Sequence, residues 1–138
     1  MPKLRHLALH TADPEATAAF YKRVFDMVEM GRTNSPFAEG IYLSDGTLNV
    51  AILRYKTPQD AERYGGSAAF GISHFGFWAE DIEETRRRLR EVGARHIDTR
   101  DHAKTPTGFF EEKWKGPDGT VIDITDQGWV GALPPGRN

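Results

Sequence analysis

The sequence predicts an α+β fold in which one strand–helix–strand–strand–strand unit, βαβββ, occurs twice. Three observations indicate this. Residues 5–13 (RHLALHTAD) and 73–81 (SHFGFWAED) share a histidine, an alternating run and an aspartate seven residues after the histidine. The similarity continues past each aspartate, where Glu and Thr recur at the same spacing. A turn sequence, Asp-Gly-Thr, also recurs, at 45–47 and at 118–120.

The first strand of each copy is expected at residues 5–10 and 73–79, because apolar side chains at every second position indicate a half-buried strand. In the first copy, one face carries Leu7 and Leu9, and the other carries His6, Ala8 and His10. In the second copy, one face carries Phe75 and Phe77, and the other carries His74, Gly76 and Trp78. Small residues beside each histidine predict space for a ligand above that face.

A helix follows each of these strands. Asp13 is suited to cap a helix over residues 14–28, and Pro14 suits its first position. The second helix is expected over 82–92, with Gly93 at its C-terminal end. Both helices would pack on the apolar strand face, which leaves the histidine face uncovered.

The remaining segments complete each copy. Hairpin strands are expected at 40–44 and 47–54 in the first copy, and at 95–98, 108–115 and 120–125 in the second. Between these lie a polar, glycine-rich linker with a short helical piece (55–71), a candidate substrate lid (100–107) and an irregular tail (127–138).

Composition narrows the class of protein. A length of 138 residues indicates one domain, 1–138. A net charge of −2 gives no reason to expect nucleic acid or an acidic membrane as a partner. The absence of cysteine excludes disulfides and thiolate ligands, and no apolar run has the length of a membrane span. A cytoplasmic protein is therefore expected.

Two histidines and one aspartate form the candidate metal site. Alternation in the strand Val121–Thr125 turns Asp123 toward the histidine face, where a carboxylate needs a partner. A single strand histidine is more often structural, but the repeat makes His6 and His74 equivalent. Together they predict a 2-His-1-carboxylate set, the arrangement associated with non-haem Fe(II).

These motifs resemble the vicinal oxygen chelate superfamily, also called the glyoxalase/bleomycin resistance/extradiol dioxygenase group. The resemblance spans about residues 4–126 and is carried by the His6–Asp13 entry with Phe20-Tyr21, the His74–Asp81 repeat and the segment Gly116–Asp123. It implies two modules, about 4–64 and 72–126, whose strands form a half-open mixed barrel around a divalent metal, with the helices on the outer face.

The resemblance also implies the ligand set. Family members bind metal on the first and last strands of each module, which here are the positions of His6, His74, Asp123 and, by the alignment of the two hairpins, Val50. Valine cannot coordinate a metal, so a three-ligand site is expected. Asp123 stands where the similar groups usually carry glutamate. The expected cofactor is Fe(II), with Mn(II), Ni(II) or Zn(II) as alternatives.

Three functions follow from the resemblance. The first is an extradiol-dioxygenase-like enzyme acting on a small, oxygen-chelating substrate, for which an aromatic compound is one option. The second is a glyoxalase-like lyase or isomerase, or a transferase, that uses the same site without O₂. The third is a non-catalytic binder of small molecules such as drugs. The resemblance also implies a homodimer, in which modules can be exchanged between chains.

Further residues are expected near the metal. His10 shares the face of His6 and is predicted to transfer protons, with a role in supporting the metal ligands as the alternative. Glu112 is expected to enter the barrel in preference to Glu111, because it alternates in phase with Phe110 and Trp114. The predicted substrate wall consists of Trp78, Phe110 and Tyr42.

Overall fold

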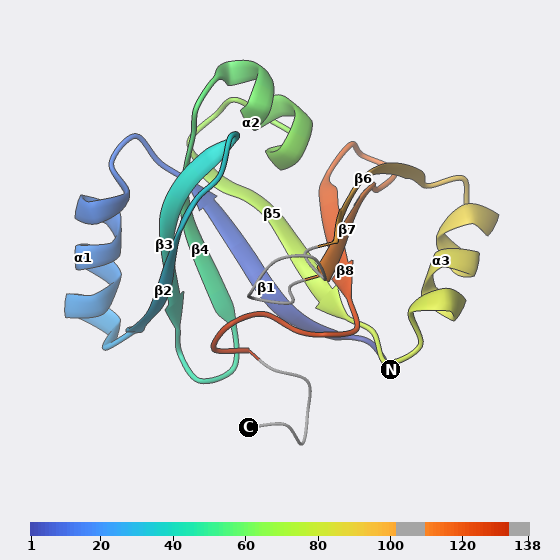
Figure 1. The fold of residues 1–138 in the computed structure, drawn as a ribbon, viewed down its shortest axis with the longest axis horizontal. Helices are drawn as coiled ribbons and strands as arrows, with labels where there is room; N and C mark the ends of the chain where they lie inside the picture. Colours follow the sequence, from blue (N-terminus) through green and yellow to red (C-terminus); the bar gives the residue numbers. More distant parts are fainter. Residues whose placement is uncertain (102–109, 133–138) are drawn as a thin grey trace.

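The structure, a computed structural model, describes residues 1–101 and 110–132 (Figure 1). The elements in chain order are β1 (Lys3–His10), α1 (Pro14–Phe25), β2 (Val28–Asn34), β3 (Ala38–Ser44), β4 (Asn49–Tyr55), α2 (Pro58–Gly65), β5 (Gly71–Trp78), α3 (Ile82–Glu91), β6 (Arg95–Asp101), β7 (Phe110–Lys115) and β8 (Val121–Thr125).

All eight strands belong to one mixed sheet with the order β2-β3-β4-β1-β5-β8-β7-β6. Within each module the first strand pairs in parallel with the last, β1 with β4 and β5 with β8. The two modules join where β1 and β5 pair antiparallel. Figure 1 shows the sheet curling into a half-barrel, with α1 and α3 on its outer side. The predicted α+β fold of two βαβββ modules is confirmed.

The helices begin where their caps predict. The Asp13 side chain accepts a hydrogen bond from the backbone N–H of Ala16, and Asp81 accepts one from Glu84 in the same way. Helix α1 covers the outer face of β3 and β4. The core there consists of Ala18, Ile41, Leu43, Val50 and Ile52. Helix α2 closes one end of the inner face, where Ala61 and Tyr64 pack with Ala8, Leu53 and Tyr55.

Two segments differ from the prediction. Helix α1 ends at Phe25, and Asp26 takes a left-handed φ of 54°, so that Val28, expected at the end of the helix, begins strand β2. Strand β2 lies at the edge of the sheet and is largely exposed, so it lacks the alternation that marks a half-buried strand. The tail, expected to be irregular, forms a bridge between Trp129 and Ala132.

The predicted lid at 100–107 overlaps β6, which continues to Asp101, and its remainder lies outside the described residues. None of the helices in residues 1–101 and 110–132 has the length and apolar composition that crossing a bilayer requires.

Candidate metal centre and its cavity

Three buried side chains from three adjacent central strands converge at one point. His6 of β1, His74 of β5 and Asp123 of β8 are 4%, 3% and 0% exposed. The Nε2 atoms of His6 and His74 are 3.3 Å apart, and they lie 3.7 and 3.2 Å from Asp123 Oδ2. The structure therefore brings together the three predicted ligands within a single chain.

The outer nitrogen of each imidazole has a partner, and for His6 that partner decides the tautomer. His6 Nδ1 lies 2.7 Å from the Asn49 side-chain oxygen, which can only accept, so Nδ1 carries the proton. His74 Nδ1 contacts two hydroxyls, Ser73 Oγ at 3.0 Å and Tyr55 at 3.4 Å. Burial lowers the pKa of both histidines, against the opposing effect of Asp123. Neutral rings held by their outer nitrogen are the form in which histidine binds metal.

The spacing fits a divalent ion. Ligand atoms about 2.1 Å from an ion lie about 3.0 Å apart at right angles and about 3.4 Å apart in a tetrahedron. The observed separations of 3.2–3.7 Å are close to these values. A second argument is chemical: with the proton of His6 on Nδ1, its Nε2 lone pair and an oxygen of the Asp123 carboxylate face each other with no proton between them. A cation resolves that arrangement.

A buried lysine already partners the aspartate. Lys113 of β7 is 3% exposed, and its Nζ donates to Asp123 Oδ1 at 2.9 Å and to Oδ2 at 3.0 Å. Burial acts to lower the pKa of Lys113, but Asp123 and Glu111 outweigh it, so the pKa lies above its usual range. Burial raises the pKa of Asp123, but Lys113 and the histidines lower it more strongly, so this pKa lies well below its usual range. The carboxylate thus remains ionised between Lys113 and the two imidazoles.

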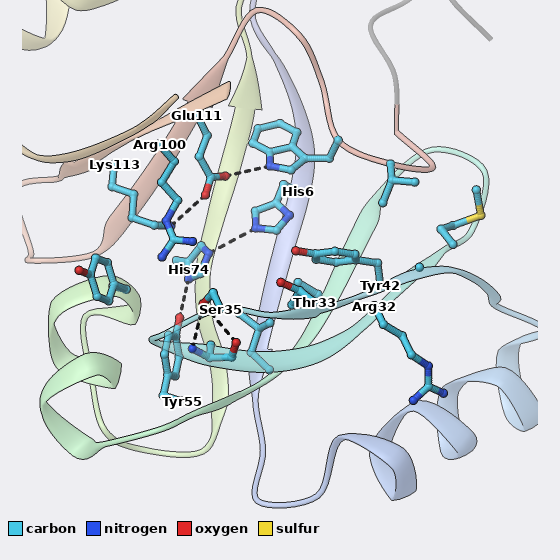
Figure 2. A pocket seen from close by; sticks show the side chains of 18 residues that line it. His6, Arg32, Thr33, Ser35, Tyr42, Tyr55, His74, Arg100, Glu111 and Lys113 are labelled. Carbon is cyan, nitrogen blue, oxygen red and sulfur yellow. Dashed lines mark hydrogen bonds and ion pairs between the residues drawn. The ribbon is translucent and has the colours of Figure 1, made fainter. Parts of the chain in front are cut away.

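The histidines form part of the wall of a cavity of about 430 Å³ (Figure 2). Figure 2 shows the rings of His6 and His74 directed toward each other, with Glu111, Arg100 and Lys113 extending from one wall. Tyr42, predicted to contact substrate, lines the same cavity. Further aromatic lining comes from Tyr55, Tyr64 and Trp129.

The acidic residue that enters the cavity is Glu111, so the predicted orientation of Glu112 is wrong. Glu112 faces α3, where it binds Arg86 and accepts from the Trp114 indole at 3.1 Å. Side chains alternate along β7 as predicted, but the residues that face inward are the ones predicted to face outward. Phe110 and Glu112 contact Arg86 of α3, and the charged residues Glu111 and Lys113 line the cavity.

Three other predicted residues lie away from the cavity. His10 is buried on the inner face, but its Nδ1 contacts the Ala69 carbonyl at 3.1 Å and its ring contacts Tyr55 and Phe70. The Trp78 indole donates to the Asp126 carbonyl at 3.2 Å. Phe110 lies on the α3 side, with the Arg86 guanidinium 5.9 Å from its ring centre. None of the three is among the described residues that line the cavity.

The fourth-ligand position is Ala51, not Val50. Gly76, two residues after His74, pairs with Asp123, and Ala8, two residues after His6, pairs with Ala51. The first hairpin has one residue more between its Asp-Gly-Thr turn and this position than the second, which shifts the alignment by one. Val50 therefore packs under α1. The expectation of three ligands is unchanged, because alanine cannot coordinate either.

The tail residue Trp129 was missed by the sequence prediction. Its ring stacks on His6 with centres 4.9 Å apart, and its Nε1–H donates to Glu111 Oε2 at 3.1 Å. A Cβ atom on Gly76 would lie 2.8 Å from the Trp129 ring. The indole of Trp129 therefore fills the space above Gly76, where the sequence predicted room for a ligand. A tryptophan in an apparently irregular tail was the available signal.

Comparison with known proteins agrees with this architecture. The family model of the Glyoxalase/Bleomycin resistance protein/Dioxygenase superfamily matches residues 3–124. No curated protein matches the chain by sequence.

Similar solved structures share the fold at low sequence identity. A hypothetical protein, BH1468, from Bacillus halodurans C-125 has a TM-score of 0.70 and 17% identity, covering 89% of this chain and 92% of that one. A methylmalonyl-CoA epimerase variant of Streptomyces coelicolor, in complex with 2-nitronate-propionyl-CoA, has a TM-score of 0.71 and 15% identity. The match covers 88% of this chain and 94% of that one. The methylmalonyl-CoA epimerase of Mycobacterium tuberculosis has a TM-score of 0.69 and 16% identity, and the match covers 88% of this chain and 85% of that one.

Proposed function

Since the chain belongs to the Glyoxalase/Bleomycin resistance protein/Dioxygenase superfamily, we propose that it is a divalent-metal-dependent enzyme that transfers a proton beside a metal-chelating oxygen of a small substrate, as isomerases and lyases do. The observation that carries this proposal is a buried carboxyl group, Glu111, in the same cavity as His6 and His74. This carboxyl group supports an O₂-independent reaction as the first candidate.

His6, His74 and Asp123 would hold the metal. Three protein ligands leave positions open for a substrate with two neighbouring oxygens, and a bound divalent ion supplies Lewis acidity there. Fe(II), Mn(II), Ni(II) and Zn(II) all accept imidazole ligands, so the ligand types leave the choice of metal open.

Glu111 is suited to hold and return the proton. Trp129 fixes its Oε2, which leaves Oε1, 3.6 Å from Lys113 Nζ, to face the cavity. Burial and the charge of Asp123 raise the pKa of Glu111 above its ordinary value, against the opposing effect of Lys113. A carboxyl group whose pKa is moved toward neutrality exchanges protons more effectively at physiological pH.

The methylmalonyl-CoA epimerases among the similar structures support this choice in one respect. They show that the fold carries an epimerase in other organisms, although at 15–16% identity the likeness is one of fold.

An extradiol-dioxygenase-like activity is the second candidate. The 2-His-1-carboxylate set favours it, because this set is associated with Fe(II) oxygenases. His10 was expected to transfer protons in that reaction. It contacts Tyr55 and Phe70 away from the described cavity lining, so its role stays a prediction without structural support.

A homodimer also remains a proposal. Its support is a patch of exposed apolar side chains on α1 and the start of β2, formed by Phe20, Val24, Phe25 and Val28. Light scattering of the purified protein would test it, and a monomer at micromolar concentration would contradict it.

Metal binding is tested first. The purified protein is expected to bind about one equivalent of divalent metal, and His74→Ala is expected to lose at least tenfold in affinity because one ligand is removed. Elemental analysis and metal titration measure both, with His96→Ala, an exposed histidine, as the control. Wild-type protein without stoichiometric metal would instead favour the non-catalytic binder.

Proton transfer is tested with Glu111→Gln. Metal-loaded wild type in D₂O is expected to exchange the C–H next to the chelating oxygen in a panel of small 2-oxo, 2-hydroxy and malonyl-type acids, detected by NMR. Glu111→Gln is expected to slow this exchange about 10²–10⁴-fold while metal binding persists.

Two results would contradict the assignment. Equal exchange rates in Glu111→Gln and wild type would remove the role of the carboxyl group. Oxygen consumption by Fe(II)-loaded protein with catechols, without proton exchange, would favour the dioxygenase. Glu112→Gln serves as the matched control, since this neighbour faces α3.

A further inference from the structure

We infer that the cavity contains a second subsite, built around Arg100, that binds an anionic group of the substrate, so that the substrate is a small dianion with a chelating end and a separate carboxylate. The inference extends the proposed function, because the chelating end is placed at the metal centre proposed above.

Arg100 is held in place but not satisfied. It belongs to β6 and lines the cavity, and its guanidinium lies 5.1 Å from the ring centre of Phe37 and 5.3 Å from that of Tyr64. Its Nε is buried without a hydrogen-bond partner. Among the described residues it is the only buried side-chain nitrogen or oxygen in this condition. A buried donor without an acceptor is energetically unfavourable, and a bound anion would supply the missing acceptor.

The other inner cation is already occupied. Lys113 Nζ donates to both carboxylate oxygens of Asp123 and lies 3.6 Å from Glu111. Arg32, at the outer part of the cavity, pairs with Glu15 and Glu29 on the surface. A ligand anion therefore finds a free donor at Arg100 and not at these two cations.

The charge of the cavity favours a dianion. Arg100 and Lys113 contribute two positive charges, and Glu111 and Asp123 contribute two negative charges, so the protein groups balance. A divalent ion at the triad would leave two positive charges to be matched. A substrate with one anionic group at the metal and one at Arg100 would neutralise both.

The chemistry at Arg100 points to a carboxylate. A guanidinium offers a planar fork that matches carboxylate geometry, and stacking on aromatic faces orients that plane. The cavity of about 430 Å³ lies at the small end of the range for ligand sites, which suits a small dicarboxylate or a carboxylated catechol.

Matched ligand pairs test the subsite in metal-loaded protein by calorimetry. The pairs are 2-oxoglutarate with 2-oxopentanoate, and 3,4-dihydroxybenzoate with catechol; in each pair only the first member has a carboxylate in addition to its chelating group. Wild type is expected to bind the first member about tenfold or more tightly than the second. Arg100→Gln should abolish this preference without weakening binding of the second member, and Arg100→Lys should retain part of the preference.

Arg63→Gln is the matched control. Arg63 also lies over Tyr64, at 5.3 Å, but it belongs to α2 and is absent from the described cavity lining, so its loss should leave the preference intact. Circular dichroism verifies that each variant is folded.

The subsite is overturned if wild type shows no preference in either pair, or if Arg100→Gln keeps it. Failure of the metal centre gives a different pattern. Glutarate would then still bind metal-free protein in an Arg100-dependent manner, while metal analysis and proton exchange are negative.

Discussion

Lys113→Met is expected to destabilise the metal-free protein by about 3–5 kcal/mol, because removing one partner of a buried ion pair leaves a buried charge without compensation. The residue left behind is Asp123, fully buried beside Glu111 in the same interior. Methionine retains most of the side-chain volume, so the effect reports charge and not a cavity. Urea unfolding of the protein in EDTA measures it.

Divalent metal should reverse much of this loss. A metal ion at the triad neutralises Asp123 in place of the lysine, so saturating metal is expected to raise the melting temperature of Lys113→Met more than that of wild type. Lys115→Met, on the same strand but only half-buried, is the control. If both lysine variants lose the same stability, or metal stabilises wild type and Lys113→Met equally, the compensating role of Lys113 is refuted.

The metal-free protein is also expected to lose stability as the pH falls below about 6.5. The pKa values of His6 and His74 are lowered from 6.5 by burial. Below pH 6.5 the unfolded chain therefore binds protons that the folded chain does not, and the free energy of unfolding falls. Two such groups give a slope of up to about 2.7 kcal/mol per pH unit.

Two carboxyl groups modify this dependence. The lowered pKa of Asp123 contributes stability that is lost only well below this range. The raised pKa of Glu111 acts in the opposite direction, because the folded state then binds the extra proton and partly offsets the loss. Between pH 6.5 and 5.5 the two histidines are expected to dominate.

Urea unfolding at pH 7.5, 6.5 and 5.5 in EDTA measures the slope. His74→Asn should reduce this slope by the contribution of about one bound proton. His96→Asn, at an exposed position, should leave the slope unchanged. An unfolding free energy that is constant across this range would show that the imidazoles are not held neutral.

Much of the fold and the centre of the site were determined by local sequence. The repeat of histidine, alternating run and aspartate specified two equivalent strand–helix entries, and Asp13 and Asp81 cap the two helices as expected. Because a strand turns alternate side chains to opposite faces, His6 and His74 had to share the uncovered face. Asp123 joined them because a carboxylate in an apolar strand needs a partner.

Tertiary structure decided which phase and which distant segment complete the site. Period-two alternation along β7 is equally consistent with Glu111 or Glu112 inside, and the tertiary structure turns Glu112 outward, where it pairs with Arg86 of α3. One residue of difference between the hairpins moved Ala51 into the position expected for Val50. Trp129 reaches His6 across more than a hundred residues, and Arg100 is positioned by rings from the β2–β3 turn and from α2. Contacts of this kind depend on strand register and long-range packing, which residue periodicity does not encode.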